Sequence, residues 1–205
     1  MRFEALQTIF PTAVVFSTEL LLQIDPSFNR ENLFHRQKSE KIIQIKKWWY
    51  VFPDRLYDES DLFRIAHQIV QPSYVSLESA LSYYGLIPET VITVTSVTTK
   101  KTQQNRSTIG VFSYAQLHTR LFRWYTLVPD PKGSFYMARI EKALLDYLYL
   151  HHEMNSNEAF EERRIYREGL REVLDYTVFE DFTARFAKKA LRKRADLFLH
   201  YLKNA

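Results

Sequence analysis

The sequence predicts an α+β protein in which a winged helix-turn-helix precedes a larger α+β domain. The first observation is a run of helical apolar spacing that ends in a β-prone hairpin at residues 41–52. The second is a series of β-branched and aromatic runs at residues 91–137, followed by helical spacing to residue 205. We therefore expect a winged helix-turn-helix over 1–56, a connector helix over 57–71, and an α+β domain over 72–205. That domain should hold a small, mostly antiparallel sheet and a helical C-terminal tail.

Composition restricts the classes of function. Apolar residues make up 46% and aromatic residues 15% of the chain, which is enough for buried cores. The absence of cysteine excludes disulfides and thiolate chemistry and suits a reducing cytoplasm. We expect neither a secretory signal nor a membrane span, because no apolar run reaches about 18 residues. The net charge of +4 is mild, so nucleic-acid contacts should come from local patches. We expect no cofactor, since no glycine-rich phosphate-binding motif occurs.

The N-terminal 56 residues predict three helices and a hairpin. Pro11 ends a first amphipathic segment, and Ser17 is placed to cap a second helix. The third helix should span about 28–39, and a Lys-Lys pair lies at the tip of the hairpin. The apolar residues expected inside are Leu6, Ile9, Phe10, Leu20, Leu21, Ile24, Leu33 and Phe34.

This order of elements is typical of a winged helix-turn-helix. In such a module the third helix would enter the major groove and the hairpin would lie along the DNA backbone. Arg30 and Asn29 could read guanine and adenine, and Lys46 and Lys47 could contact phosphates. Ordinary solvated charges on a helical domain are the alternative. No glycine or asparagine lies at the hairpin tip, which counts against a tight wing. The predicted DNA-binding residues are Asn29, Arg30, Asn32, Arg36, Lys46 and Lys47.

The connector and the stretch after it both predict helices. Asp58, Ser60 and Asp61 should open the connector helix, whose apolar positions fit one buried face. Residues 72–89 then predict a short helix, capped when the Ser76 hydroxyl accepts a backbone N–H and ended by Gly85 in a left-handed conformation. We expect this second helix to be the packing hinge between the two domains.

The centre of the chain predicts four strands, at residues 91–98, 108–114, 124–128 and 135–137. Residues 99–106 should form a polar turn or mobile loop. Lys100, Lys101 and Arg106 in this segment are a candidate surface for nucleic acid or an acidic partner, although such a loop is more often simply solvated. A helix beginning near Ala138 should follow the last strand.

Two groups of side chains suggest metal or acid–base chemistry, but neither has suitable spacing. His151, His152 and Glu153 lack the HExxH spacing, and neighbouring helix residues point about 100° apart. Glu141 and Asp146 diverge on one helix, so salt bridging is the better interpretation. We therefore expect no metal site, no catalytic residue and no enzymatic activity.

The tail from residue 155 predicts a helix from Asn155 or Ser156 through Tyr166, a break at Gly169, and further helices to the end. Six basic residues within ten positions form either a solvated helix face or a contact surface for nucleic acid or an acidic protein. They are Arg185, Lys188, Lys189, Arg192, Lys193 and Arg194.

The chain resembles the AbiEi-type antitoxins, the transcriptional-regulator half of the AbiE abortive-infection (type IV) toxin–antitoxin systems. Residues 62–70 leading into Pro72-Ser73-Tyr74-Val75-Ser76-Leu77-Glu78-Ser79-Ala80-Leu81-Ser82-Tyr83-Tyr84-Gly85-Leu86-Ile87-Pro88-Glu89 look like the family's central motif. Ala138 followed by Glu141-Lys142-Ala143-Leu144-Leu145-Asp146 looks like its second. The family usually has a glycine after the basic pair of the wing, and here Lys46-Lys47 is followed by Trp48.

The resemblance implies a repressor that binds its own promoter through the winged helix and counteracts a nucleotidyltransferase-like toxin encoded nearby. It supports DNA contact by Asn29, Arg30, Arg36, Lys46 and Lys47, and implies no catalytic residue. The toxin is then a functional partner, with or without direct contact. The alternative is a protein-interaction module of the same fold that no longer binds DNA.

Overall fold

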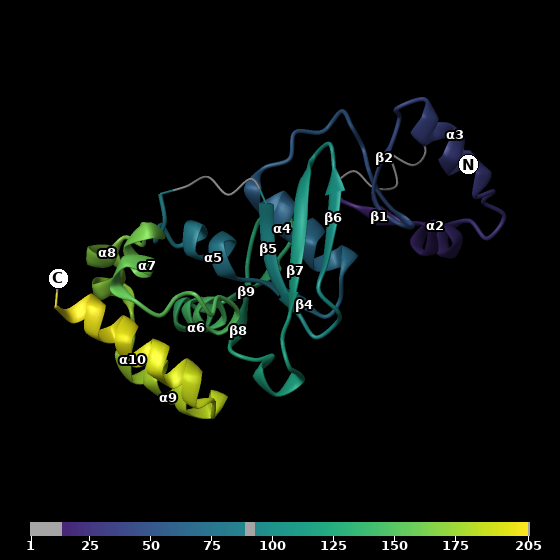
Figure 1. The fold of residues 1–205 in the computed structure, drawn as a ribbon. Coiled ribbons are helices and arrows are strands. Elements are labelled where there is room, and N and C mark those ends of the chain that lie inside the picture. Colours follow the sequence, from purple (N-terminus) through teal and green to yellow (C-terminus); the bar gives the residue numbers. More distant parts are fainter. Residues whose placement is uncertain (1–13, 89–92, 205) are drawn as a thin grey trace.

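Two β-sheets and the helices around them form the α+β fold of the computed structural model, which describes residues 14–88 and 93–204 (Figure 1). The N-terminal module and the C-terminal helices lie at opposite ends of the molecule, with the larger sheet between them. The first predicted helix, with Leu6, Ile9 and Phe10, and the start of the strand predicted at 91–98 lie outside the described residues.

From residue 14 onward, the N-terminal module has two short helices on a three-stranded antiparallel sheet of order β1-β3-β2. The predicted cap of its first helix is confirmed, because the Ser17 Oγ accepts the Leu20 N–H at 3.1 Å. The small core of the module is made of Phe16, Leu21, Phe28, Leu33, Ile42, Tyr50 and Phe52. The elements are β1 (Phe16–Ser17), α2 (Thr18–Ile24), α3 (Glu31–Lys38), β2 (Ile43–Lys46) and β3 (Trp49–Val51).

The prediction that Phe34 points into this core is wrong. Phe34 is 66% exposed, whereas Leu33 beside it is 2% exposed. Successive residues of a helix point about 100° apart. Because Leu33 faces the core, the side chain of Phe34 points away from it. Leu20 and Ile24 of α2 were also expected inside and are largely exposed, at 36% and 44%.

The connector helix is confirmed as α4 (Glu59–Ile69), which begins with a capping box between Asp58 and Asp61. The Arg64 guanidinium is buried and bonds Asp61 of the same helix, Asp130 at 2.6 Å and the Gly133 carbonyl at 3.0 Å. These bonds fasten α4 to the turn that joins two strands of the larger sheet. The connector is therefore a packed part of the fold.

The larger sheet has six strands in the order β6-β7-β5-β4-β9-β8. Three of its five neighbouring strand pairs are antiparallel, in line with the expected mostly antiparallel sheet, whereas β4 pairs with β9 and β5 with β7 in parallel, so the sheet is mixed. All four predicted strands are present. The strands are β4 (Ser73–Val75), β5 (Thr93–Thr98), β6 (Gln103–Ser107), β7 (Gly110–Gln116), β8 (Tyr125–Val128) and β9 (Phe135–Ala138).

The expectation of a loop over 99–106 is wrong in its second half, because residues 103–106 lie in β6. Gln103 pairs with Tyr114 and Ser107 with Gly110 along the antiparallel β6–β7 ladder. Polar residues fill both faces of this edge strand, so it has no apolar alternation that could indicate a strand.

The stretch at 72–89 divides into a strand and a helix, where a helix alone was predicted. Residues 73–75 form β4, and the helix is α5 (Leu77–Tyr83). Ser76 occupies the N-cap position, but the prediction that its hydroxyl caps the helix is wrong. The Ser79 N–H instead donates to the Thr95 Oγ1 at 3.0 Å. The predicted left-handed stop is confirmed by Gly85, whose φ is +69°.

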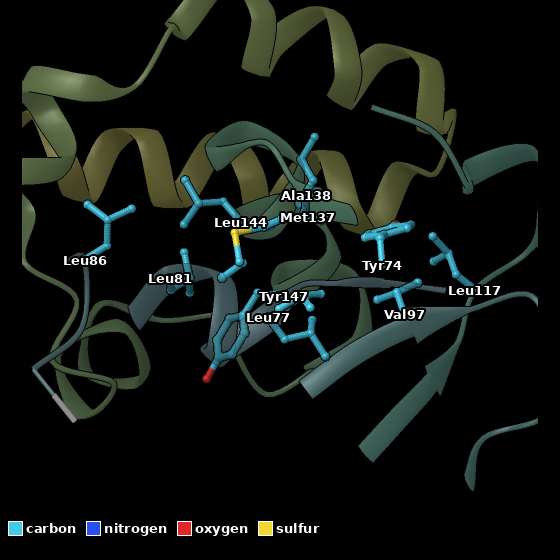
Figure 2. Close-up of a cluster of buried hydrophobic side chains, with 14 of the residues drawn as sticks. Tyr74, Leu77, Leu81, Leu86, Val97, Leu117, Met137, Ala138, Leu144 and Tyr147 are labelled. Carbon is cyan, nitrogen blue, oxygen red and sulfur yellow. The ribbon is translucent and has the colours of Figure 1, made fainter. Parts of the chain in front are cut away.

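The main core lies between α5, α6 (Ile140–Leu150) and the larger sheet. Figure 2 shows Leu77 and Leu81 of α5, Leu144 of α6 and Met137 of β9 in this core. The remaining elements are η1 (Thr119–Leu121), α7 (Asn157–Glu162), α8 (Arg167–Val173), α9 (Tyr176–Phe186) and α10 (Lys189–Lys203).

Two details of the predicted tail are wrong. The helix that Ser156 caps ends at Glu162 and does not continue through Tyr166. Gly169 lies inside α8, where a Cβ atom would be 2.4 Å from the Tyr166 ring. The glycine is therefore required for close packing of that ring.

Candidate nucleic-acid interface

The start of α3 is held by the side chain of Asn29. Its Oδ1 accepts the Glu31 N–H at 2.9 Å, and its Nδ2 donates to the Glu31 carboxylate at 3.3 Å. Asn side chains commonly form such local turns and satisfy backbone groups at helix starts. The amide that was predicted to read adenine is exposed but already bonded within the chain.

Arg30 and Lys47 come together on the ring of Trp48. The Arg30 guanidinium lies 5.9 Å and the Lys47 ammonium 5.2 Å from the ring centroid, both within the range of cation–π attraction. Both cations are exposed, and the ring is 46% exposed. The start of the helix and the tip of the hairpin therefore form one cationic, aromatic surface, which we call the Arg30–Lys47–Trp48 cluster.

Trp48 also explains how a hairpin without glycine is closed. Its φ is +72°, the left-handed conformation that glycine or asparagine usually adopts in hairpin turns. The β2–β3 register shifts between Gln44 and Lys46, next to the tip. Sequence reasoning noted the missing glycine but did not identify Trp48 as part of the site, although its place directly after two lysines was a usable signal.

The cluster borders a hollow of about 420 Å³ that reaches the start of α2. Three segments of the module therefore converge here: the N-terminus of α2, the turn before α3 and the hairpin tip. One carboxylate, that of Glu19, is among the lining side chains. The hollow is lined by Ser17, Thr18, Glu19, Leu22, Arg30, Lys47, Trp48 and Trp49.

Lys46 points away from this cluster. Its ammonium donates to the Ile69 carbonyl, the last of α4, at 2.6 Å. Cations stabilise the C-terminal carbonyls of helices. Burial, together with the positive charge of Lys100, lowers the pKa of Lys46. Lys46 thus fastens the hairpin to the connector helix, and of the two predicted phosphate contacts only Lys47 lies in the exposed cluster.

The other predicted residues of α3 are less accessible. Asn32 and Arg36 are both half-buried. The Arg36 guanidinium lies 5.9 Å from the Phe28 ring, so its side chain packs along the core of the module. Neither residue is part of the Arg30–Lys47–Trp48 cluster.

The basic residues of 100–106 are divided by strand β6. Lys100 and Lys101 precede the strand and are exposed, and β6 packs beside β2 of the hairpin. Arg106 lies near the other end of β6, opposite Val111, and donates to Gln104 at 2.9 Å. The positive charge of Lys100 acts on Lys46, so Lys100 lies near the hairpin, whereas Arg106 lies further along β6, apart from Lys100 and Lys101.

The basic residues of the tail lie on the far side of the molecule from the hairpin (Figure 1). The Lys188 ammonium donates to the Tyr149 hydroxyl, and the Arg194 Nε donates to the Leu148 carbonyl, both at 2.8 Å. Burial lowers the pKa of Arg194. Lys189, Arg192 and Lys193 are exposed. These cations cannot belong to the same local surface as Arg30 and Lys47.

A second cluster lies in the centre of the fold and is fully buried. The Lys142 ammonium donates to one oxygen of Asp146, and the Tyr74 and Ser76 hydroxyls donate to the other at 2.9 and 3.0 Å. Burial raises the pKa of Asp146 and lowers that of Lys142. The cluster joins the two motifs that carry the resemblance. All four side chains are at 0% exposure, so a substrate cannot reach them in this conformation.

The side chains considered in the sequence for metal or acid–base chemistry form local contacts. Glu141 accepts the Asp175 N–H at 3.2 Å, away from Asp146. His151 and Arg163 both bond Glu153, at 3.0 and 3.1 Å. Within 14–88 and 93–204, no three His, Asp or Glu side chains are grouped as metal ligands. None of the helices in that part of the chain combines the length and apolarity needed to cross a bilayer.

A comparison of the sequence with protein-family models and with curated proteins gives no match.

Proposed function

We propose that the chain binds double-stranded DNA through its N-terminal module, acting as a winged helix-turn-helix repressor of its own promoter. We further propose that it is the antitoxin of an AbiE-like, type IV system that counteracts a nucleotidyltransferase-like toxin, as the resemblance implies. In this proposal the chain works in the cytoplasm, by binding and without catalysis.

The observation that carries the proposal is the meeting of Arg30 and Lys47 on Trp48. In a winged helix-turn-helix, the recognition helix enters the major groove while the wing follows the backbone. With the α3 start and the β2–β3 tip side by side, Arg30 could reach a base edge while Lys47 meets a phosphate. Lys100, which is exposed and acts on Lys46 of the hairpin, and its exposed neighbour Lys101 would add backbone contacts.

Fluorescence anisotropy with a labelled duplex from the DNA upstream of its own gene tests the proposal. We expect Arg30→Ala and Lys47→Ala each to weaken binding by about tenfold, since a good contact is worth ~1–3 kcal/mol. Lys47→Ala should also lower the slope of affinity against salt by about one. Arg120→Ala is the matched control, because Arg120 is exposed and lies outside the module.

Absence of binding at low salt, where phosphate contacts are strongest, would overturn the proposal. Equal losses in the Arg120→Ala control would show that total charge, and not the cluster, attracts the DNA. The antitoxin part is tested separately, by producing the neighbouring toxin with and without this chain. Unchanged growth arrest would exclude that role.

A second candidate is a protein-interaction module that no longer binds DNA. Two observations favour it. Lys46 is bonded to the Ile69 carbonyl and so is withdrawn from DNA, and the apolar ring of Phe34 on α3 is exposed and could contact a partner. In that case the double variant Arg30→Ala, Lys47→Ala would neutralise the toxin to the same extent as the unmodified chain does. Neither protein would repress the promoter.

A further inference from the structure

The start of α10 carries five cations within seven positions, Lys188–Arg194, and no acidic residue lies between Asp181 and Asp196. Lys188 and Arg194 are fixed in place by bonds to Tyr149 and to the Leu148 carbonyl. Lys189, Arg192 and Lys193 extend from the same helix into solvent. Like charges packed this closely repel one another, so an anionic partner would stabilise this part of the surface.

A hollow of about 370 Å³ opens within this basic surface, between the end of α6 and the start of α10. Among the described residues, its lining combines cations with apolar side chains and includes no carboxylate. The lining residues are Tyr149, Leu150, His152, Lys188, Ala190, Leu191 and Arg194. A basic rim around a partly apolar hollow fits an acidic segment that also carries an apolar side chain.

Nucleic acid would use the aromatic ring differently. Single-stranded binding depends on aromatic rings whose faces can stack on bases. Here the Lys188 ammonium lies 4.8 Å from the centroid of the Tyr149 ring and also bonds its hydroxyl. The ammonium therefore lies at the hydroxyl end of the ring, and the hydroxyl already accepts a hydrogen bond. The surface is therefore better suited to carboxylates and an apolar anchor than to bases.

We propose that the hollow between α6 and α10 binds an acidic peptide segment of a partner protein, with one apolar side chain of that segment inserted over Ala190 and Leu191. Lys189, Arg192 and Lys193 attract the carboxylates, while Lys188 and Arg194 hold the shape of the rim. The site lies across the molecule from the hairpin, so both surfaces can be occupied together (Figure 1).

The first test measures anisotropy of a fluorescein-labelled peptide of repeated Glu-Glu-Leu units with the full chain. We expect binding that Lys189→Glu with Lys193→Glu weakens by at least tenfold. The matched control reverses two exposed charges elsewhere, Arg120→Glu with Arg139→Glu, and should change affinity by less than twofold. Combined Arg30→Ala and Lys47→Ala should leave peptide binding intact, which separates this site from the proposed DNA interface.

The second test asks whether the hollow itself is used. Ala190→Leu should partly fill it and weaken the Glu-Glu-Leu peptide severalfold, while a Glu-Glu-Gly peptide, which has no anchor, keeps its weaker affinity. Circular dichroism and thermal melting of each variant confirm that α10 is still folded.

Three results would overturn the proposal. Equal losses in both charge-reversal variants would show attraction by total charge. Tighter binding of a single-stranded oligo-dT, lost in the Lys189→Glu, Lys193→Glu variant, would assign the surface to nucleic acid. Self-association that the same variant abolishes, measured by sedimentation, would assign it to a second copy of this chain.

Discussion

Lys142 and Lys47 both lie beside an aromatic ring, but their surroundings are opposite. The Lys142 ammonium is 5.5 Å from the centroid of the Tyr74 ring and the Lys47 ammonium is 5.2 Å from that of Trp48. Lys142 is completely buried and is ion-paired with Asp146. Lys47 is exposed, and its ammonium has no ion pair within the described part of the chain.

The difference lies in where the charge is neutralised. A buried charge is tolerated only when partners replace the water it has lost, so Lys142 and Asp146 constrain which segments meet in the core. A cation on an exposed ring keeps most of its hydration and can exchange water for a ligand. Changes in the buried cluster should therefore alter stability, and changes in the exposed cluster should alter binding.

The largest effect should follow from removing one member of the buried pair. Lys142→Met leaves the Asp146 carboxylate with two hydroxyl donors and no cation. We expect a loss of about 3–5 kcal/mol in the free energy of unfolding, as for other broken buried pairs. Urea denaturation measures it.

The double variant Lys142→Met, Asp146→Asn provides the control. It removes both charges and keeps an amide oxygen that can accept from Tyr74 and Ser76, so we expect most of the lost stability to return. A single variant that loses less than about 1 kcal/mol would show that the pair is dispensable, contrary to the comparison.

Two neighbours in α3 extend the same contrast to apolar side chains. Leu33→Ala should cost about 2–5 kcal/mol, the usual range for a buried leucine. Phe34→Ala should change stability by less than about 0.5 kcal/mol, because the ring is 66% exposed. Chemical denaturation of both variants compares them directly. A large cost for Phe34→Ala would mean that the ring is covered in solution, for example by a partner.

Local features of the fold could be predicted from the sequence, because their causes lie within a few residues. The Ser17 cap acts on Leu20, and Gly85 adopts the left-handed conformation that ends α5. The four strands rich in β-branched and aromatic residues were predicted for the same reason. The edge strand β6 was missed because polar residues occupy both of its faces.

The candidate sites depend on residues far apart in the chain, which periodicity cannot bring together. Lys46 bonds a carbonyl 23 residues away, so its withdrawal from the hairpin tip could not be predicted. The salt bridging predicted for Asp146 is confirmed by its pair with Lys142, four residues away, but its bond to Tyr74 spans 72 residues and could not be predicted. The left-handed Trp48 was missed because such a conformation is uncommon outside glycine and asparagine.

A smaller effect should separate the backbone of Trp48 from its ring. Trp48→Gly and Trp48→Ala both remove the ring between Arg30 and Lys47, so both should weaken DNA binding equally. Because φ is +72°, the glycine variant should be more stable than the alanine variant by about 1 kcal/mol. Thermal melting and anisotropy on the same samples test both parts. Different DNA affinities for the two variants would indicate that the turn, and not the ring, positions the cations.

The last prediction concerns a neutral group that is partly buried. The Tyr84 hydroxyl donates to the Ala138 carbonyl at 2.8 Å, and burial raises the pKa of Tyr84 to about 12. Between pH 10 and about 12 the unfolded chain has lost this proton while the folded chain keeps it, so stability should fall as the pH rises through that window. Below pH 10 both states are protonated and the residue gives no pH dependence.

Tyr84→Phe should lose about 1 kcal/mol at neutral pH, the usual net value of one hydrogen bond, and should show a shallower decline above pH 10. Urea denaturation at pH 8 and pH 11 measures the difference. Burial also raises the pKa values of Tyr57 and Tyr147 to about 12, so these residues still cause part of the loss of stability above pH 10 in the variant. If the variant loses stability with pH as steeply as the unmodified chain, the Tyr84 proton is not retained on folding. Tyr84 would then be less buried at the α5–β9 contact than the structure indicates, and it would belong with the exposed groups of the comparison.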